Sequence, residues 1–94
     1  MSQFEVNTKD AFFKESCIYI IKNKNNNKIY IGSTINFRKR SQEHKRDLEK
    51  NDHRNKHLQK SYNKGNKFII EILQLCQKEQ LILLETDYVL THKS

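Results

Sequence analysis

Proline is absent from the sequence, cysteine occurs only twice, and no apolar run is long. A membrane-spanning helix needs roughly 18 apolar residues in a row, so we expect no membrane association. Cys17 and Cys76 are too few for a disulfide scaffold, and the N-terminus has no apolar segment of the kind found in secretory signals. We therefore expect free thiols and an intracellular protein, cytoplasmic, nuclear or viral, that is not secreted.

Neither a repeat nor a linker-like segment divides the 94 residues, so we expect one domain. We place that domain at residues 17–94 and treat residues 1–16 as an N-terminal extension of unknown role. The extension contains Phe4, Phe12 and Phe13, which indicates that it packs on the domain.

Positive charge is concentrated in one third of the chain. Residues 38–67 hold eleven Lys and Arg residues against four acidic residues, which accounts for the whole net charge of +7. Such a segment is typical of proteins that bind a polyanion, most often nucleic acid, although a solvated basic helix pair without a partner is the alternative. The residues expected to meet DNA phosphates are Arg38, Lys39, Lys45, Arg46, Arg54, Lys56 and Lys60.

Two short runs rich in isoleucine and tyrosine, residues 17–21 and 28–32, flank an asparagine-rich segment. This composition predicts a β-hairpin. Because side chains alternate along a strand, we expect Tyr19 and Tyr30 to share one face with Gly32. The isoleucines would then cover the opposite face, which we expect to be turned toward the core. The missing side chain of Gly32 would let another backbone or a substrate approach.

Helical periodicity follows the hairpin. A helix is expected over about 36–50, because Asn36 is a good N-cap and the side chains of Phe37, Ser41, His44 and Leu48 recur on one face. Asn51-Asp52 is expected to end it and to cap a second helix over about 53–63. A third strand over 68–73 and a helix over 77–91 complete the pattern. The prediction is an α/β (α+β) fold, in the order ββααβα, with a small three-stranded antiparallel sheet flanked by helices.

The last helix carries one residue that its apolar face does not explain. Glu85 lies in the middle of that face, where a carboxylate is costly unless something pairs with it. An ion pair with Arg40, a bound cation, or a position at the rim of the core all remain open. Mg²⁺ is commonly held by one or two carboxylates together with water and a phosphate. Zinc is not expected, because His53 and His57 share a helix face without a third ligand.

The hairpin resembles the paired signature of the GIY-YIG endonucleases. Cys17-Ile18-Tyr19, ten intervening residues and Tyr30-Ile31-Gly32 match it, with Cys17 in place of the first glycine. The later residues match members that are close to phage intron homing endonucleases: Arg40, His44, His53, Asn63-Lys64-Gly65, Phe68 and Glu85. No asparagine follows Asn66, whereas the family usually ends its domain with one that lines the site; a truncated catalytic fragment would account for this.

The resemblance implies a divalent-metal-dependent DNA endonuclease, monomeric as a free domain. Glu85 would bind Mg²⁺ or Mn²⁺, Arg40 would contact the scissile phosphate, and Tyr19, with or without His44, would activate the attacking water. Tyr30 would position a phosphate or the nucleophile, and His53 would assist by hydrogen bonding. The group that removes the proton stays open. The alternatives are a catalytically silent basic nucleic-acid-binding module and a basic protein-interaction domain.

Overall fold

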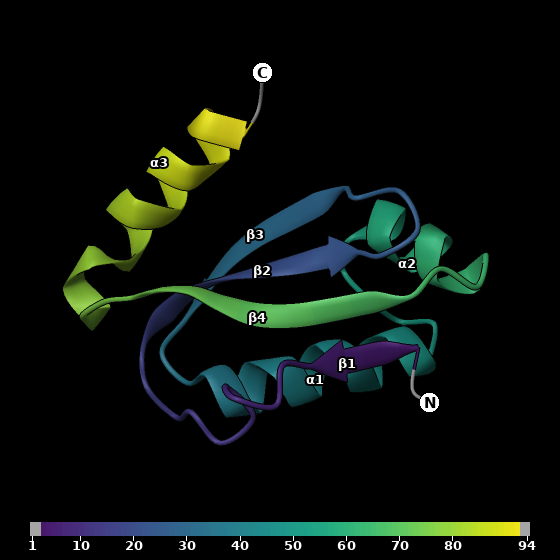
Figure 1. The fold of residues 1–94 in the computed structure, drawn as a ribbon, viewed down its shortest axis with the longest axis horizontal. Coiled ribbons are helices and arrows are strands. Elements are labelled where there is room, and N and C mark those ends of the chain that lie inside the picture. Colours follow the sequence, from purple (N-terminus) through teal and green to yellow (C-terminus); the bar gives the residue numbers. More distant parts are fainter. Residues whose placement is uncertain (1–2, 93–94) are drawn as a thin grey trace.

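The computed structural model describes residues 3–92, whose centre is a mixed β-sheet (Figure 1). The strands are β1 (Phe4–Val6), β2 (Cys17–Asn23), β3 (Ile29–Thr34) and β4 (Phe68–Leu75). They lie in the order β1-β4-β2-β3. β2 pairs antiparallel with β3 and β4, whereas β1 pairs parallel with β4. The predicted hairpin therefore forms one side of the sheet, with β3 as its edge.

The helices within these residues are α1 (Phe37–Glu49), α2 (Lys56–Asn63) and α3 (Leu81–His92), and the 3₁₀ turn η1 (Lys78–Gln80) precedes α3. α1 begins where the sequence predicts, because the Asn36 side chain accepts a hydrogen bond from the N–H of Lys39. α2 begins later than expected. Its cap is Asn55, whose side chain accepts from the N–H of Leu58, so the prediction of a cap at residues 51–52 is wrong. Asn51 instead adopts the left-handed conformation (φ 58°) that often follows a helix end.

The sheet has four strands rather than the predicted three. The added strand, β1, belongs to the N-terminal extension and runs along β4. The N–H of Phe68 donates to the carbonyl of Gln3 (2.8 Å), and the N–H of Ile72 donates to the carboxylate of Asp10 (2.9 Å). The extension therefore packs on the domain, with Phe4 only 1% exposed. A three-residue strand is too short to show an alternating pattern, which is why the sequence did not reveal it.

The main core lies on the tyrosine face of the hairpin, not on the isoleucine face as expected. Tyr19 and Ile21 are buried there against Phe37 of α1 and Leu58 of α2. The predicted inward stripe of α1 is buried throughout: Phe37, Ser41, His44 and Leu48. On the other face Ile18 is buried, but Ile20, Ile29 and Ile31 are only half-buried. The hairpin's aromatic side thus carries both core packing and the groups proposed for chemistry.

α3 lies beside the edge strand β3 and contacts β3 and β2 (Figure 1). Its predicted apolar arc is only partly covered. Leu81 is buried, whereas Ile82 is 80% exposed and Val89 is also exposed. No helix among residues 3–92 combines the length and apolar character needed to cross a membrane.

Candidate active site

Five of the six residues proposed as catalytic line one cavity of about 170 Å³. Tyr19 comes from β2 and Tyr30 from β3, Arg40 and His44 come from α1, and His53 lies in the loop before α2. The remaining lining residues are Ile21, Ile31, Arg54, Asn55 and Leu58. The predicted sharing of one face by the two tyrosines is confirmed, because Tyr19 is paired with Gly32 and Ile21 with Tyr30 in the hairpin register.

Tyr19 lies across Gly32, its partner on β3. A β-carbon at position 32 would overlap the ring carbon that bears the hydroxyl, and the hydroxyl oxygen itself. Glycine therefore makes room for the ring of Tyr19, rather than for another backbone or a substrate as the sequence suggested. An edge-on contact with Phe37, with the ring centroids 6.4 Å apart, packs the ring against α1.

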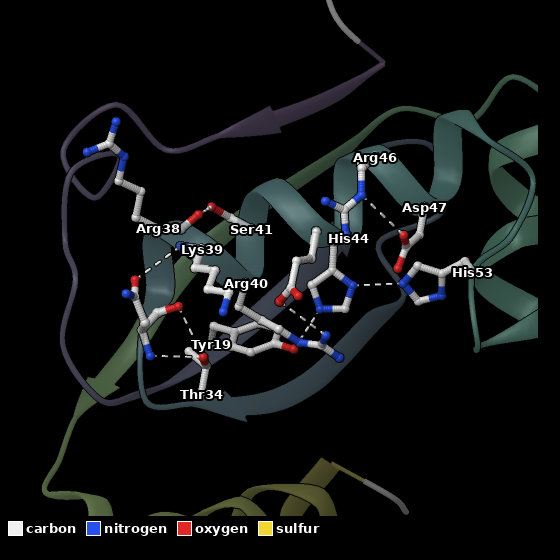
Figure 2. Close-up of polar contacts among 12 residues, drawn as sticks. Tyr19, Thr34, Arg38, Lys39, Arg40, Ser41, His44, Arg46, Asp47 and His53 are labelled. Carbon is white, nitrogen blue, oxygen red and sulfur yellow. Dashed lines mark hydrogen bonds and ion pairs between the residues drawn. The ribbon is translucent and has the colours of Figure 1, made fainter.

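Tyr19, His44 and His53 form a buried row of hydrogen-bonding groups (Figure 2). The hydroxyl of Tyr19 lies 2.7 Å from Nε2 of His44, and Nδ1 of His44 lies 2.7 Å from Nε2 of His53. The two imidazoles are stacked, with centroids 5.0 Å apart. Burial lowers the pKa of His44 to about 3, and it lowers the pKa of His53 below its usual value. Both rings are therefore neutral at pH 7.

The guanidinium of Arg40 lies beside the Tyr19 hydroxyl (Figure 2). Burial raises the pKa of Tyr19, Arg40 opposes that rise through a hydrogen bond and its charge, and the charge of Glu85 adds to the rise. Arg40 also pairs with Glu43 at 3.7 Å. No ion pair joins Arg40 to Glu85, so this possibility, which the sequence left open, is not realised.

Glu85, the sixth residue, is half-buried on α3 and is absent from the lining of the cavity. Its charge nevertheless acts on Tyr19. Among residues 3–92 Glu85 makes no ion pair, and no group of three or more His, Cys, Asp or Glu side chains is placed to hold a metal. A lone carboxylate without an ion-pair partner fits a hard cation whose other ligands are water and substrate phosphate, and it fits a protein-only metal site poorly.

The sequence matches the model of the GIY-YIG catalytic domain over residues 15–94. The chain belongs to the GIY-YIG family. The resemblance inferred from the tyrosine motifs is thus confirmed, even though Cys17 stands where the first glycine of the signature is usual. Cys17 is buried at the start of β2, and a strand there does not require glycine.

Known proteins resemble this GIY-YIG domain in sequence and in structure. Over 74 residues it is 45% identical to intron-associated endonuclease 1 of Enterobacteria phage T4, a match that covers 78% of this chain and 30% of that protein. The catalytic domain of the homing endonuclease I-TevI superposes with a TM-score of 0.79 at 41% identity, covering 85% of this chain and 90% of that one. A mutant of that domain superposes with a TM-score of 0.78, also at 41% identity. The chain thus spans less than a third of its phage T4 relative.

The basic residues of the GIY-YIG domain do not all face the cavity. Arg54 lines it, and Lys39 lines a neighbouring hollow that also contains Arg40. Arg38 points away from Tyr19, with its guanidinium 5.7 Å from the centre of the Phe12 ring (Figure 2). Three others are exposed on the helical segments without lining the cavity: Arg46, Lys56 and Lys60. Lys45 is half-buried.

Sequence reasoning missed Gln59 and the role of Asn55. Gln59 is a polar residue on α2 with only 5% exposure, and its side chain makes three hydrogen bonds. The backbone N–H of Asn55 donates to Nδ1 of His53 (3.0 Å). The position of Gln59 beside the apolar Leu58 offered one weak signal, whereas a backbone contact leaves no trace in residue type.

Proposed function

We propose that this domain is a divalent-metal-dependent endonuclease that hydrolyses phosphodiester bonds in DNA. The observation that supports it most is the convergence of Tyr19, Tyr30, Arg40 and His44 on one cavity at the edge of the basic segment 38–67. A guanidinium beside two phenols suits a phosphodiester, because the developing negative charge and the attacking water each need a fixed partner.

Each residue has a distinct part in this proposal. Arg40 binds the scissile phosphate and stabilises its added negative charge, and its charge also favours the phenolate of Tyr19. Once its own hydroxyl proton has passed to solvent in the cavity, Tyr19 removes the proton from the attacking water, while Tyr30 positions a phosphate or that water. Arg54, which lines the cavity, and Lys39, which lines the hollow that also contains Arg40, bind neighbouring DNA phosphates. The other basic residues named from the sequence add salt-dependent affinity at greater distance.

Glu85 is the residue proposed to hold Mg²⁺ or Mn²⁺. When bound, such an ion supplies charge for the leaving oxygen and for the phosphate in the transition state. The absence of an ion pair at Glu85 among residues 3–92 supports this role, because its carboxylate is available for a cation. The activity is proposed for this domain, which matches 30% of the length of its phage T4 relative.

The test is conversion of supercoiled plasmid DNA by the purified chain with Mg²⁺, with Mn²⁺ or with EDTA. We expect nicked or linear product with either metal and none with EDTA. Arg40→Ala should lower the rate by about 10²–10³-fold, as expected when one group that stabilises transition-state charge is removed. Glu85→Gln should abolish most cleavage.

Asp87→Asn is the matched control for Glu85→Gln, because it removes an exposed acid from the same helix. It should cleave like the parent protein. Undiminished cleavage by Glu85→Gln would remove the metal role from this residue. Salt-dependent DNA binding without cleavage under any metal would show a silent nucleic-acid-binding module instead.

A further inference from the structure

In one hydrogen bond at the end of the buried row, donor and acceptor cannot be exchanged. The backbone N–H of Asn55 can only donate, and its acceptor is Nδ1 of His53 at 3.0 Å. Nδ1 of His53 therefore carries no hydrogen, so this ring is neutral with its hydrogen on Nε2. The position of this hydrogen is thus fixed by a neighbouring group that can only donate.

The hydrogen position on His53 determines the hydrogen positions on His44 and Tyr19. His53 Nε2–H must donate to His44 Nδ1, 2.7 Å away, which leaves the hydrogen of His44 on its Nε2. That Nε2–H then donates to the Tyr19 oxygen, also 2.7 Å away. In this arrangement His44 cannot take a proton from Tyr19. The hydroxyl hydrogen of Tyr19 is left for the cavity.

Gln59 holds the starting point of this row in place. Its Oε1 accepts the backbone N–H of His53 (3.0 Å), and its Nε2 donates to the carbonyl of Leu48 at the end of α1 and to the side chain of Asn63 (both 3.0 Å). One side chain therefore ties the loop that carries His53 to both α1 and α2. Gln59 itself does not line the cavity, so it acts on the row only through the residues that it holds.

We propose that Gln59 and the backbone amide of Asn55 are positioning groups that hold His53, and through it His44, with hydrogen on Nε2. Tyr19 then accepts from His44 and presents its own hydrogen to the substrate side. This inference rests on the proposed nuclease function for its purpose but not for its geometry. The low pKa of His44, caused mainly by burial, agrees with it, because protonating Nδ1 would oppose the His53 N–H.

The direct test is long-range ¹H–¹⁵N correlation NMR of the imidazole nitrogens in the metal-free chain at pH 7. We expect His44 and His53 each to show a single tautomer with hydrogen on Nε2. Hydrogen on Nδ1 of either ring overturns the proposal whether or not the protein cuts DNA. If the tautomers are as stated and no DNA is cut, only the nuclease proposal fails.

Gln59→Leu tests the positioning role. We expect mixed tautomers at His44 and a fall in kcat of about 10- to 100-fold with KM little changed, a loss typical when a group that orients a functional side chain is removed. Gln42→Leu makes the same change on the exposed side of α1 and should alter neither readout.

Gln59→Glu keeps an acceptor for the His53 N–H and should retain the Nε2–H tautomers, and it serves as the test if Gln59→Leu does not fold. Unchanged tautomers and unchanged kcat in a folded Gln59→Leu protein would contradict the role of Gln59. Mixed tautomers in a folded Gln59→Glu protein would contradict the importance of its acceptor oxygen.

Discussion

Tyr19 and Gly32 are cross-strand partners whose contact is possible only because residue 32 has no side chain. We expect Gly32→Ala to push the ring away from β3 and to separate its hydroxyl from His44. Tyr19 is buried, so the shift must disturb packing and should cost about 1–3 kcal/mol, as overpacking of a core commonly does. Urea unfolding at pH 7 measures the loss, and DNA cleavage should fall with it.

Ser33→Ala, at the adjoining position of β3, is the control for that substitution. It adds no atoms and should keep stability and cleavage close to those of the parent protein. A Gly32→Ala protein with full stability and full cleavage would show that the ring has room to move without consequence.

Acid should weaken the fold through His44. Its folded pKa of about 3 lies below its unfolded value near 6.5, so between these values the unfolded chain binds the proton that the folded one refuses. Stability contributed by the neutral ring is complete above pH 6.5 and is lost as the pH falls toward 3. Each pH unit well inside this window costs up to about 1.4 kcal/mol per such histidine. His53, whose pKa is also lowered, adds to the loss in the same direction.

Urea unfolding at pH 7, 5.5 and 4.5 measures this slope. His44→Gln should flatten it, whereas His57→Gln, which removes an exposed histidine of α2, is the matched control. An equally steep slope in His44→Gln would assign the acid sensitivity to other groups.

The N-terminal extension should contribute to stability through Phe4. This side chain is 1% exposed within the core, so Phe4→Ala should cost about 3–5 kcal/mol. Phe12→Ala removes an equal side chain that is 78% exposed and should change stability by no more than about 0.5 kcal/mol. Thermal unfolding of the two variants separates them. Equal melting temperatures would show that β1 is dispensable.

The two free cysteines should differ in thiol reactivity. Cys17 is fully buried, and burial together with Cys76 and Asp10 raises its pKa to about 12. Cys76 is partly exposed, although burial raises its pKa as well. Titration with an aromatic disulfide reagent should modify Cys76 first and Cys17 only when the protein unfolds. Rapid modification of Cys17 at pH 7 would contradict its placement.

Much of the site was predictable because it lies on local, regular patterns. Strand alternation places Tyr19 and Tyr30 on one face, and helical spacing places Arg40 beside the buried His44. These rules hold within one element and need no knowledge of the fold. They predicted the hairpin, α1 and four residues of the cavity, whereas His53 was expected only from the family resemblance.

What the sequence could not supply depends on distant partners. β1 forms by pairing with a strand at the other end of the chain, and the start of α2 depends on Asn55 rather than on the equally plausible Asn51-Asp52. The buried face of the hairpin was assigned wrongly because isoleucine is more apolar than tyrosine. Tyr19 is buried nonetheless, since Gly32 gives its ring space and His44 pairs with its hydroxyl.

Surface connections between helices are usually where a protein scaffold accepts grafted tags, labels and inserted loops. Residues 50–55 are exposed except for His53. The His53 ring hydrogen-bonds to His44 of α1 and to the backbone N–H of Asn55 just before α2. Its placement therefore depends on the number of residues in this segment. Engineers who lengthen it would disturb Tyr19, the proposed catalytic tyrosine, two side chains away. The exposed asparagine-rich bend at residues 24–27 is the safer place for such a graft.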